Sequence, residues 1–293
     1  MVDLSIIIPS YNTEQVTRNT LDSLFSALQK SSKMITDEVI VVDNGSQDGS
    51  VAMLRKIKQP FFHLIELPNN LGYGKANNIG LAQANGKYIL YLNSDILLDN
   101  VDFVDLISYL EAHAEVGGLT VRVNLPEGGI DPASHRGFPT IWRSFCYFSK
   151  LEALTFKIPY LNGIFGGYHL ASCSLDTIHQ IDAPTGAFFL VRKTILDKLE
   201  GFDEDFFMYG EDLDLAYRIR NLNYSIVYYP SQSVTHLKSK SGLQNKKSKT
   251  RNSTRRHFYE SMKIFYDKHY ASSHSFLTNI IIHSIISLKQ KFS

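Results

Sequence analysis

The chain has few cysteines, almost no net charge and no long apolar run. Its two cysteines, Cys146 and Cys173, cannot build a framework of disulfides, so a reducing compartment is the simpler expectation. The formal net charge of +1 gives no global field that would favour nucleic acid as a partner. No apolar run reaches the ~20 residues of a membrane span, and no basic region with a cleavage site precedes the first apolar stretch. We therefore expect neither a membrane-spanning helix nor a signal peptide.

Alternating strand and helix patterns fill the first hundred residues. Apolar runs predict strands over 4–11, 39–43, 62–68 and 88–95, with helical patterns between them. Continuous β-branched residues, as in VIVVD, are typical of parallel strands covered on both faces. With 293 residues and 44% hydrophobic content, the chain is long enough for one large domain or two small ones. The order predicts a doubly wound α/β fold with a mostly parallel central sheet.

The pattern becomes looser after residue 95. A helix is expected over 103–113 and a strand over 117–125, followed by an irregular stretch, rich in glycine and aromatics, over 126–180. Such a long stretch inside a domain is usually functional or mobile. Regular patterns return with a strand over 187–193, a helix over 194–200, a helix at GEDLDL and the strand SIVYYP.

Three acids and one histidine fall where strands end or helices begin. Asp43 closes EVIVVD, Asp95 closes KYILYLNSD, Asp212 lies in GEDLD, and His236 follows YSIVYYPSQSVT. Ligands of open α/β sheets bind outside the carboxyl ends of the strands. The pattern therefore predicts a site for a metal ion and a phosphorylated ligand at that edge.

The segment DNGSQDGS (43–50) has two interpretations. Asp43 can accept the N3–H of a uracil or thymine ring, while the turn Asn44-Gly45-Ser46 lets the ring approach the backbone. Alternatively, Asn-Gly is an ordinary turn and Asp48 an ordinary acid of a first helical turn.

The segment NNLGYGKANN (69–78) is equally open. Gly72 allows close approach of a ligand, and Lys75 could meet a phosphate at a helix start. The alternative is a plain helix-entry loop, since no dinucleotide or Walker pattern is present.

The remaining motifs have the chemistry of a metal site and a general base. An acid such as Asp95 after an apolar strand can hold Mg²⁺ or Mn²⁺, although it could equally cap a helix. Asp212, beside Glu211, could act as general base on an alcohol, or the two acids could simply favour the helix macrodipole. His236 becomes a candidate metal ligand only because the other motifs require a metal nearby.

The C-terminal segment combines positive charge with an amphipathic pattern. Lysines and arginines crowd residues 244–257, and residues 275–291 predict a helix too short to span a membrane. Contact with an anionic membrane surface and docking on the protein's own core are equally compatible with this pattern, and a homodimer through the helix is also open. The apolar face of this helix comprises Phe276, Leu277, Ile280, Ile281, Ile285 and Leu288.

Taken together and in this order, IIIPSYN, VVDNGSQDGS, the loop 69–80, NSD and GFDEDFFMYGEDLDLAYRI with a downstream His resemble family 2 of the inverting glycosyltransferases. The resemblance covers roughly residues 3–240. PASHRGFPT (132–140) and GFDEDFFMYGEDLDL (201–215) are similar to the bacterial rhamnosyltransferase-like branch. The family resemblance implies a GT-A fold over 1–240, with a nucleotide-binding half (1–95) and an acceptor and catalytic half (96–240). A basic and amphipathic helical extension (241–293) would follow.

The resemblance also implies roles for residues. Asp212 would be the general base with Glu211 in support, and Asp95 and His236 would hold a divalent Mg²⁺ or Mn²⁺, with Asn93 where the family often has Asp. Arg136 would meet the donor phosphate or the acceptor. The residues expected to contact the donor are Pro9, Tyr11, Asn12, Asp43, Asn44, Ser46, Gly72, Lys75, Asn78, Asn93, Ser94, Arg136, Thr185 and Gly186, with Ala187 beside them.

The expected activity is metal-dependent, inverting transfer of a sugar from a nucleotide-diphosphate donor, first of all dTDP-rhamnose, to a lipid-linked or oligosaccharide precursor of a surface glycan. UDP-hexose and UDP-N-acetylhexosamine donors remain alternatives. The expected location is the cytoplasm, peripheral at the inner face of the plasma membrane. A nucleotidyltransferase would carry a Gly-rich basic loop where this chain has PSYNTEQV. A non-catalytic binding or scaffold subunit would have little reason to keep Asp95, Asp212 and His236.

Overall fold

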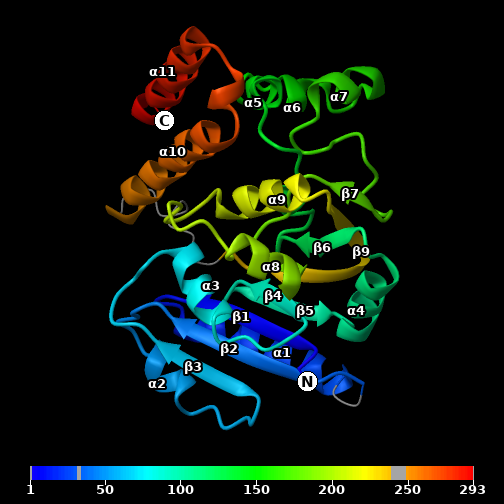
Figure 1. The fold of residues 1–293 in the computed structure, drawn as a ribbon, viewed down its shortest axis with the longest axis vertical. Helices are drawn as coiled ribbons and strands as arrows, with labels where there is room; N and C mark the ends of the chain where they lie inside the picture. The colour runs from blue at the N-terminus through cyan, green and yellow to red at the C-terminus, as the bar shows by residue number, and fades with distance from the viewer. Residues whose placement is uncertain (1, 32–33, 239–248, 293) are drawn as a thin grey trace.

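The apolar runs of the sequence form buried strands at the centre of the molecule, as the computed structural model of residues 2–31, 34–238 and 249–292 shows (Figure 1). Within these residues the strands join into one nine-stranded sheet in the order β3-β2-β1-β4-β8-β6-β9-β5, with β7 paired to β9. The strands are β1 (Leu4–Ser10), β2 (Asp37–Asp43), β3 (Phe62–Glu66), β4 (Tyr88–Leu92), β5 (Ile96–Asn100), β6 (Val116–Asn124), β7 (His179–Ile181), β8 (Phe188–Arg192) and β9 (Ser225–His236). The α-helices are α1 (Glu14–Ser31), α2 (Ser50–Leu54), α3 (Tyr73–Leu81), α4 (Phe103–Ala112), α5 (Ile141–Phe148), α6 (Leu151–Thr155), α7 (Pro159–Phe165), α8 (Lys193–Leu199), α9 (Glu211–Asn221), α10 (Lys249–His269) and α11 (Phe276–Phe292).

Alternate residues of the strands build two cores, one on each face of the sheet. Ile6 and Ile8 of β1 pack in the same core as side chains of α1, α2 and α4. Ile7, between them, packs in the other core with side chains of α3, α8 and α9. Because successive side chains of a strand point to opposite faces, one fully apolar strand supplies both cores. The sequence prediction of an α/β fold with helices on both faces is confirmed.

The N-terminal half of the sheet is parallel and the C-terminal half is mixed. β1 pairs in parallel with β2 and β4, and β2 pairs in parallel with β3. β8 then runs antiparallel to both β4 and β6, whereas β6 and β9 are parallel to each other. β5 and β7 are antiparallel to β9. The expected parallel order therefore describes the first half best, because strands over 187–193 and 117–125 give no sign of direction in their sequence.

These pairings bring the functional motifs to one edge. β9 is parallel to β6, and both have the direction of β4 because β8 reverses between them. The carboxyl ends of β1, β2, β4 and β9 and the beginning of β8 therefore lie along the same side of the sheet. Residues 10, 43, 93–95, 185–187 and 236 stand at this edge.

The stretch 126–180, expected to be irregular, contains a 3₁₀ turn (Pro132–Ser134), β7 and the three helices α5, α6 and α7. Each of these helices has eight residues or fewer. Thr140 caps α5 through its side chain, which accepts a hydrogen bond from the amide of Arg143. Helices this short give little periodic signal, which explains the difference from the prediction.

The C-terminal extension is helical, as predicted, but α11 does not pack through its apolar face. Asn279 accepts a hydrogen bond from Tyr266 of α10 at 2.7 Å, and His283 lies 2.7 Å from Asp267. Ile286 is the buried apolar residue of α11, whereas all six side chains of the predicted apolar face are exposed. Part of the basic stretch, including Lys246 and Lys247, lies outside the described residues. Among the helices that are described, none is both long and apolar enough to cross a membrane.

Candidate active site

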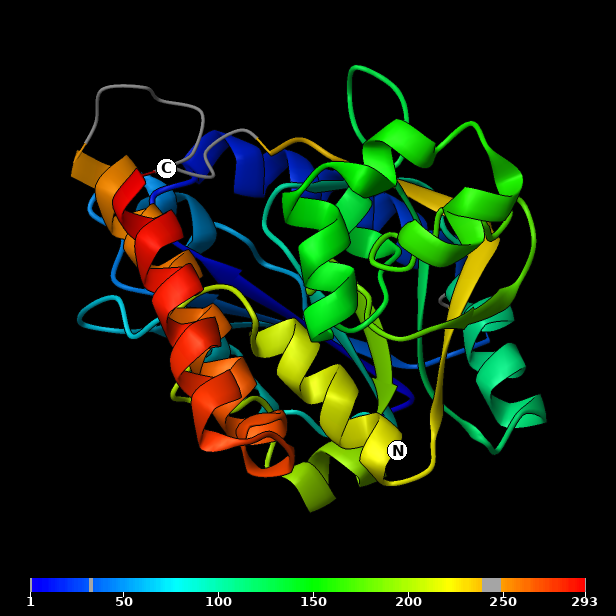
Figure 2. The same cartoon turned by 90° about the horizontal axis from the view of Figure 1, so that it is seen from above.

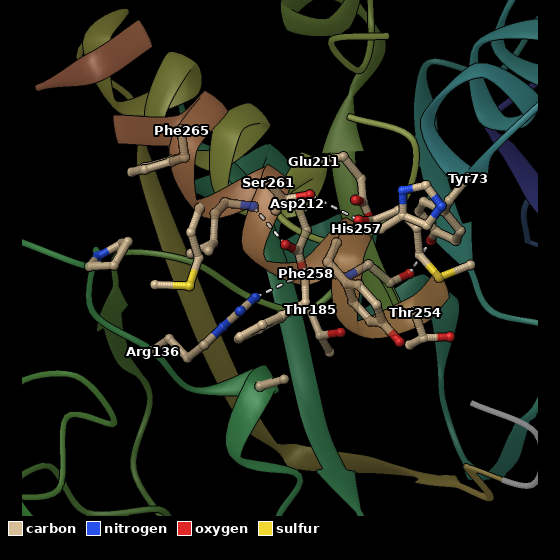
Figure 3. Close-up of a pocket in the computed structure, with 18 of the residues that line it drawn as sticks. Tyr73, Arg136, Thr185, Glu211, Asp212, Thr254, His257, Phe258, Ser261 and Phe265 are labelled. Atoms are coloured by element: carbon tan, nitrogen blue, oxygen red, sulfur yellow. Dashed lines mark hydrogen bonds and ion pairs between the residues drawn. The ribbon is translucent and has the colours of Figure 1, made fainter. Parts of the chain in front are cut away.

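A cavity of about 1620 Å³ lies against the carboxyl edge of the sheet. Strand ends, the start of α9 and one side of α10 form its walls (Figure 3). The structure thus brings together residues from loops that are far apart in sequence. The predicted site residues that line it are Pro9, Tyr11, Asn12, Asn44, Asn93, Ser94, Asp95, Arg136, Thr185, Gly186, Glu211, Asp212 and His236.

Asp43 lies next to the cavity wall, and its two carboxylate oxygens differ in their hydrogen bonding. Its Oδ1 accepts a hydrogen bond from the amide of Ser46 at 2.8 Å, which closes the tight turn. Its Oδ2 is buried and has no hydrogen-bond partner among the described residues. A buried acceptor without a donor is costly, so the arrangement suits a ligand N–H. Ser46 supports the neighbouring loop, because its hydroxyl accepts from the amide of Asn12 at 2.9 Å.

Asn44 organises the second loop. Its side-chain oxygen accepts from the amide of Leu71, and its nitrogen donates to the carbonyl of Gly72 at 3.0 Å. Gly72 has φ +93°, and a Cβ there would lie 2.6 Å from the carbonyl oxygen of Phe207. The glycine is therefore required by close packing of two protein loops, and it does not face the cavity.

Lys75 and Asn78 are also directed away from the cavity. Lys75 pairs with Glu204 at 3.0 Å on the exposed side of α3. The side chain of Asn78 donates to the carbonyl and accepts from the amide of Phe202, both at 2.8 Å. The prediction that these residues, with Gly72, contact the donor is not favoured by this geometry. They fasten α3 to the loop over 201–207 instead.

Asp95 and His236 form the core of a candidate metal site. His236 Nε2 lies 3.2 Å from Asp95 Oδ1, and His236 Nδ1 lies 2.8 Å from Asp131 Oδ2. Burial acts to lower the pKa of His236, but Asp131 and Asp95 together raise it to about 9. Burial likewise acts to raise the pKa of Asp131, but hydrogen bonds from His236 and Lys238 hold it well below its usual range.

The residues present suit a metal that also binds substrate. A carboxylate oxygen and an imidazole nitrogen this close can bind one divalent ion. The buried side-chain oxygen of Asn93, on the same loop as Asp95, has no partner among the described residues. No group of three or more His, Cys, Asp or Glu side chains that could hold a metal is found in the part of the chain that the structure describes. Mg²⁺ and Mn²⁺ commonly complete such sparse sites with water and phosphate oxygens.

The two acids at the start of α9, Glu211 and Asp212, have different surroundings. Asp212 Oδ2 accepts from Arg136 at 2.8 Å and from the amide of Gly186 at 3.3 Å, and its Oδ1 accepts from the amide of Leu213 at 2.7 Å (Figure 3). These donors stabilise a carboxylate. Glu211, by contrast, is buried, and its Oε2 has no partner among the described residues.

The surroundings of Glu211 change its pKa. Burial, together with the negative charge of Asp212, raises the pKa of Glu211 to about 8. At neutral pH Glu211 is therefore mostly protonated and can donate a hydrogen bond. Asp212, which accepts hydrogen bonds from Arg136, Gly186 and Leu213, stands at the position of the predicted base. An acid with a raised pKa beside a second, hydrogen-bonded acid is typical of an acid–base site.

Several residues of the cavity were missed by the sequence analysis. Tyr73 donates to the carbonyl of Gly186 at 2.9 Å and forms part of the cavity wall. Asp131, at the end of the strand-like run 117–125 and its turn, lay in the stretch considered irregular. Side chains of α10 also line the cavity, although this helix was assigned to an extension outside the site (Figure 3). They include Thr254, His257, Phe258 and Ser261.

α10 is tied to the loop that precedes α9 by specific contacts. The Ser261 hydroxyl donates to the carbonyl of Met208 at 3.0 Å, and the rings of His257 and Phe207 have centroids 4.7 Å apart. In addition, His269 lies 2.7 Å from Asp214, which is fully buried and also pairs with Arg218. Asp214 therefore supports the helix and does not face the cavity.

Comparison with known proteins identifies the family. The model of glycosyl transferase family 2 matches residues 5–173. Rhamnosyltransferase WbbL of Escherichia coli is 28% identical over 239 residues, which cover 79% of this chain and 82% of that protein. The N-acetylglucosaminyl-diphospho-decaprenol L-rhamnosyltransferase of Mycobacterium tuberculosis is 26% identical, over 69% of this chain and 67% of its own length. Of the poly-beta-1,6-N-acetyl-D-glucosamine synthase of Staphylococcus epidermidis, at 23% identity, the chain spans only 48%.

Solved structures share the fold. TarS 1–349 of S. aureus in complex with UDP-GlcNAc superimposes with a TM-score of 0.60 at 19% identity, covering 99% of this chain and 73% of that one. The mannosyltransferase PcManGT of Pyrobaculum calidifontis, in complex with GDP-Man and Mn²⁺, gives a TM-score of 0.58 at 18% identity, over 99% and 71% of the two chains. The predicted GT-A fold is confirmed, and the chain belongs to glycosyl transferase family 2 as a glycosyltransferase of the rhamnosyltransferase-like branch.

Proposed function

We propose that this glycosyltransferase moves a sugar from a nucleoside-diphosphate donor to a hydroxyl of a lipid-linked precursor of a cell-surface glycan. dTDP-rhamnose is the first candidate donor, because two relatives are named as rhamnosyltransferases and one of these names a decaprenol-linked acceptor. UDP-hexose and UDP-N-acetylhexosamine are the alternatives. Asp43 would accept the N3–H that uracil and thymine share, so it does not distinguish these donors.

One observation carries the proposal: Asp212 and the Asp95–His236 pair line the same cavity. In our mechanism Asp212 removes the proton from the acceptor hydroxyl while that oxygen attacks the anomeric carbon of the donor. The new carbon–oxygen bond forms as the bond to the diphosphate breaks, and the nucleoside diphosphate leaves with the electron pair. A single displacement of this kind inverts the configuration and needs one base without a protein nucleophile.

The remaining residues would position the substrates and balance their charge. Asp95 and His236, with the Asn93 oxygen nearby, would hold Mg²⁺ or Mn²⁺, which supplies positive charge to the departing diphosphate when bound. Arg136 donates a hydrogen bond to Asp212 at 2.8 Å and would hold its carboxylate in place. Glu211, protonated, would donate a hydrogen bond to a sugar or acceptor oxygen. Peripheral membrane contact through the C-terminal segment would bring the enzyme to the lipid-linked acceptor.

A thermal-shift panel of nucleoside diphosphates and nucleotide sugars, with and without Mn²⁺, tests the donor class. A ligand at 100 times its Kd should stabilise the fold by about 2.7 kcal/mol. We expect metal-dependent stabilisation by dTDP or UDP compounds, and loss of the metal dependence in Asp95→Ala. No response to any pyrimidine diphosphate, or undiminished Mn²⁺-dependent affinity in Asp95→Ala, would contradict the proposal. A bound donor without turnover on any acceptor would instead indicate a binding or scaffold subunit.

A further inference from the structure

Exposed apolar side chains gather at one end of the molecule. Figure 1 shows α5, α6, α7 and α11 together at this end; seen from above in Figure 2, α11 lies over α10 on one side and α5–α7 lie on the other. Lys289 of α11 lies 4.7 Å from the ring of Phe148 in α5, which joins the two groups of helices. We call this end the apical surface and define it by six exposed residues: Leu154, Phe156, Tyr160, Leu277, Ile281 and Leu288.

The apolar exposure is large for a water-facing surface. Leu154 is 74% exposed, Tyr160 79% and Leu277 70%. Contiguous exposed apolar side chains of this extent mark sites of contact with a partner or a membrane. Because α11 packs on α10 through Asn279 and His283, its apolar face has no cover in the described part of the chain.

The charges of the apical surface are of one sign. Residues 276–292 contain no acid, and the single acid of residues 139–167, Glu152, is buried and bound to His169. Lys150, Lys157 and Lys291 are exposed on these helices. Two copies of the chain meeting through this surface would bring like charges together, whereas anionic lipid headgroups complement them. Exposed Trp142 and Tyr160 are residue types that favour the membrane interface.

The cavity extends to the helices that carry this surface, because residues of α5 and α11 line it. Near Asp212 its walls are polar, but between α5 and the α10–α11 pair they become apolar. Phe145 and Phe148 of α5 face this part together with Met262 of α10 and Ile282 and Ile285 of α11. An isoprenoid chain could lie between these helices, which would place the sugar at its head near the base.

We propose that α5–α7 and α11 together form one docking surface for an anionic lipid bilayer, and that the lipid of the acceptor enters the cavity between α5 and α11. The second part rests on the proposed function. The docking surface thus extends beyond the C-terminal segment to helices more than 100 residues earlier in the chain, so both parts must meet the bilayer at once.

Vesicle flotation of the full chain tests the docking surface. We expect the wild-type protein to bind vesicles of phosphatidylglycerol and phosphatidylcholine but not vesicles of phosphatidylcholine alone. The double variants Leu154→Glu/Tyr160→Glu and Leu277→Glu/Ile281→Glu should each lower the partition coefficient by about tenfold or more. Met34→Glu, at an apolar residue 73% exposed beyond the end of α1, is the matched control and should bind as wild type does.

Two outcomes would overturn the proposal. Loss of binding only in the α11 variant would restrict membrane contact to the C-terminal helix. Wild-type protein that ignores anionic vesicles and sediments as a dimer, which either double variant converts to a monomer, would make the surface a contact between two copies.

A kinetic experiment tests whether the lipid of the acceptor enters between α5 and α11. Ile282→Glu should raise the KM for N-acetylglucosamine on a polyprenyl diphosphate at least tenfold more than the KM for the same sugar on a short alkyl diphosphate. Equal effects on both acceptors would contradict entry between α5 and α11. Thermal shifts induced by the donor, measured on the wild type and all variants, distinguish failure of this inference from failure of the proposed function. If the wild type shows no shift, the proposed function is contradicted. The result of vesicle flotation still decides on the docking surface.

Discussion

Arg136 and Asp212 form a buried ion pair, 2.8 Å from Nη2 to Oδ2, at the point where α9 begins. The side chains are 10% and 12% exposed, so each charge depends on the other for its solvation. The contact joins two residues that are 76 positions apart in the sequence.

We expect Arg136→Met to lower the free energy of unfolding by about 3 kcal/mol, because Asp212 would be left buried without its partner. The double variant Arg136→Met/Asp212→Asn should lose less than the sum of the two single variants, by at least about 1 kcal/mol. Urea unfolding measures all three. Arg55→Met, which breaks the exposed pair with Glu66, is the control and should leave the urea midpoint nearly unchanged. Strict additivity would show that the pair is not coupled.

Asp212→Asn should retain donor binding and lose turnover by about 10²–10⁴-fold, because the amide cannot take the proton of the acceptor. Glu211→Gln should lose much less, since an amide can still donate a hydrogen bond. Single-turnover assays with calorimetric donor binding separate the two effects. Transfer at the wild-type rate by Asp212→Asn would move the role of base to Glu211, because Asp214 is held by Arg218 and His269 away from the cavity.

The stability of the fold should depend on pH through Glu211. Its pKa rises from 4.5 in the unfolded chain to about 8 in the folded one, so between these values the folded state binds more protons. Stability from this group is complete below pH 4.5 and is lost as the pH rises through 8. The free energy of unfolding of wild type minus that of Glu211→Gln should therefore fall from pH 5 to pH 8.5. A constant difference across this range would disprove the shift.

Asp131→Asn should weaken the binding of Mn²⁺ by about 10–100-fold, because the carboxylate that orients His236 from behind would be lost. Titration calorimetry with Mn²⁺ and the nucleoside diphosphate measures it without any turnover. Asp176→Asn, at an exposed acid that pairs with Arg122, is the control. If Mn²⁺ binds Asp131→Asn as tightly as wild type, Asp131 does not position a metal ligand.

Asp43→Asn should weaken dTDP and UDP binding by about 10-fold or more, because an amide nitrogen facing the base N3–H removes a charge-assisted hydrogen bond. CDP provides the internal comparison, since cytosine offers an acceptor at N3 and should gain relative to the other two. An equal loss for all three nucleotides would indicate that Asp43 only shapes the turn to Ser46.

Strand ends and acids could be predicted from sequence because both depend on local patterns. The runs before Asp43 and Asp95 are apolar throughout, and parallel strands necessarily bring their ends together. The direction of β8 could not be predicted, because the apolar pattern of a strand does not show whether it runs parallel or antiparallel to its neighbours. The contribution of α10 was missed for a different reason: Thr254, His257 and Ser261 reach the cavity only through the tertiary position of their helix.

The face by which α11 packs on the protein could not be predicted from the sequence either. Periodicity predicted an apolar face for α11, and all six residues of that face are exposed. Which side meets the protein depends on the partners that Tyr266 and Asp267 offer on α10. Hydrophobicity alone favours burial of the apolar side, and here hydrogen bonds and Ile286 fix the opposite arrangement.

The position of α10 across the cavity also governs when the site comes into being. Its wall is built from residues 253–289, while the strands that carry Asp43 and Asp95 are made in the first third of the chain. During synthesis on the ribosome, the strands at the sheet edge are therefore made before the wall opposite Asp212. The cavity is complete only after the last two helices have been synthesised.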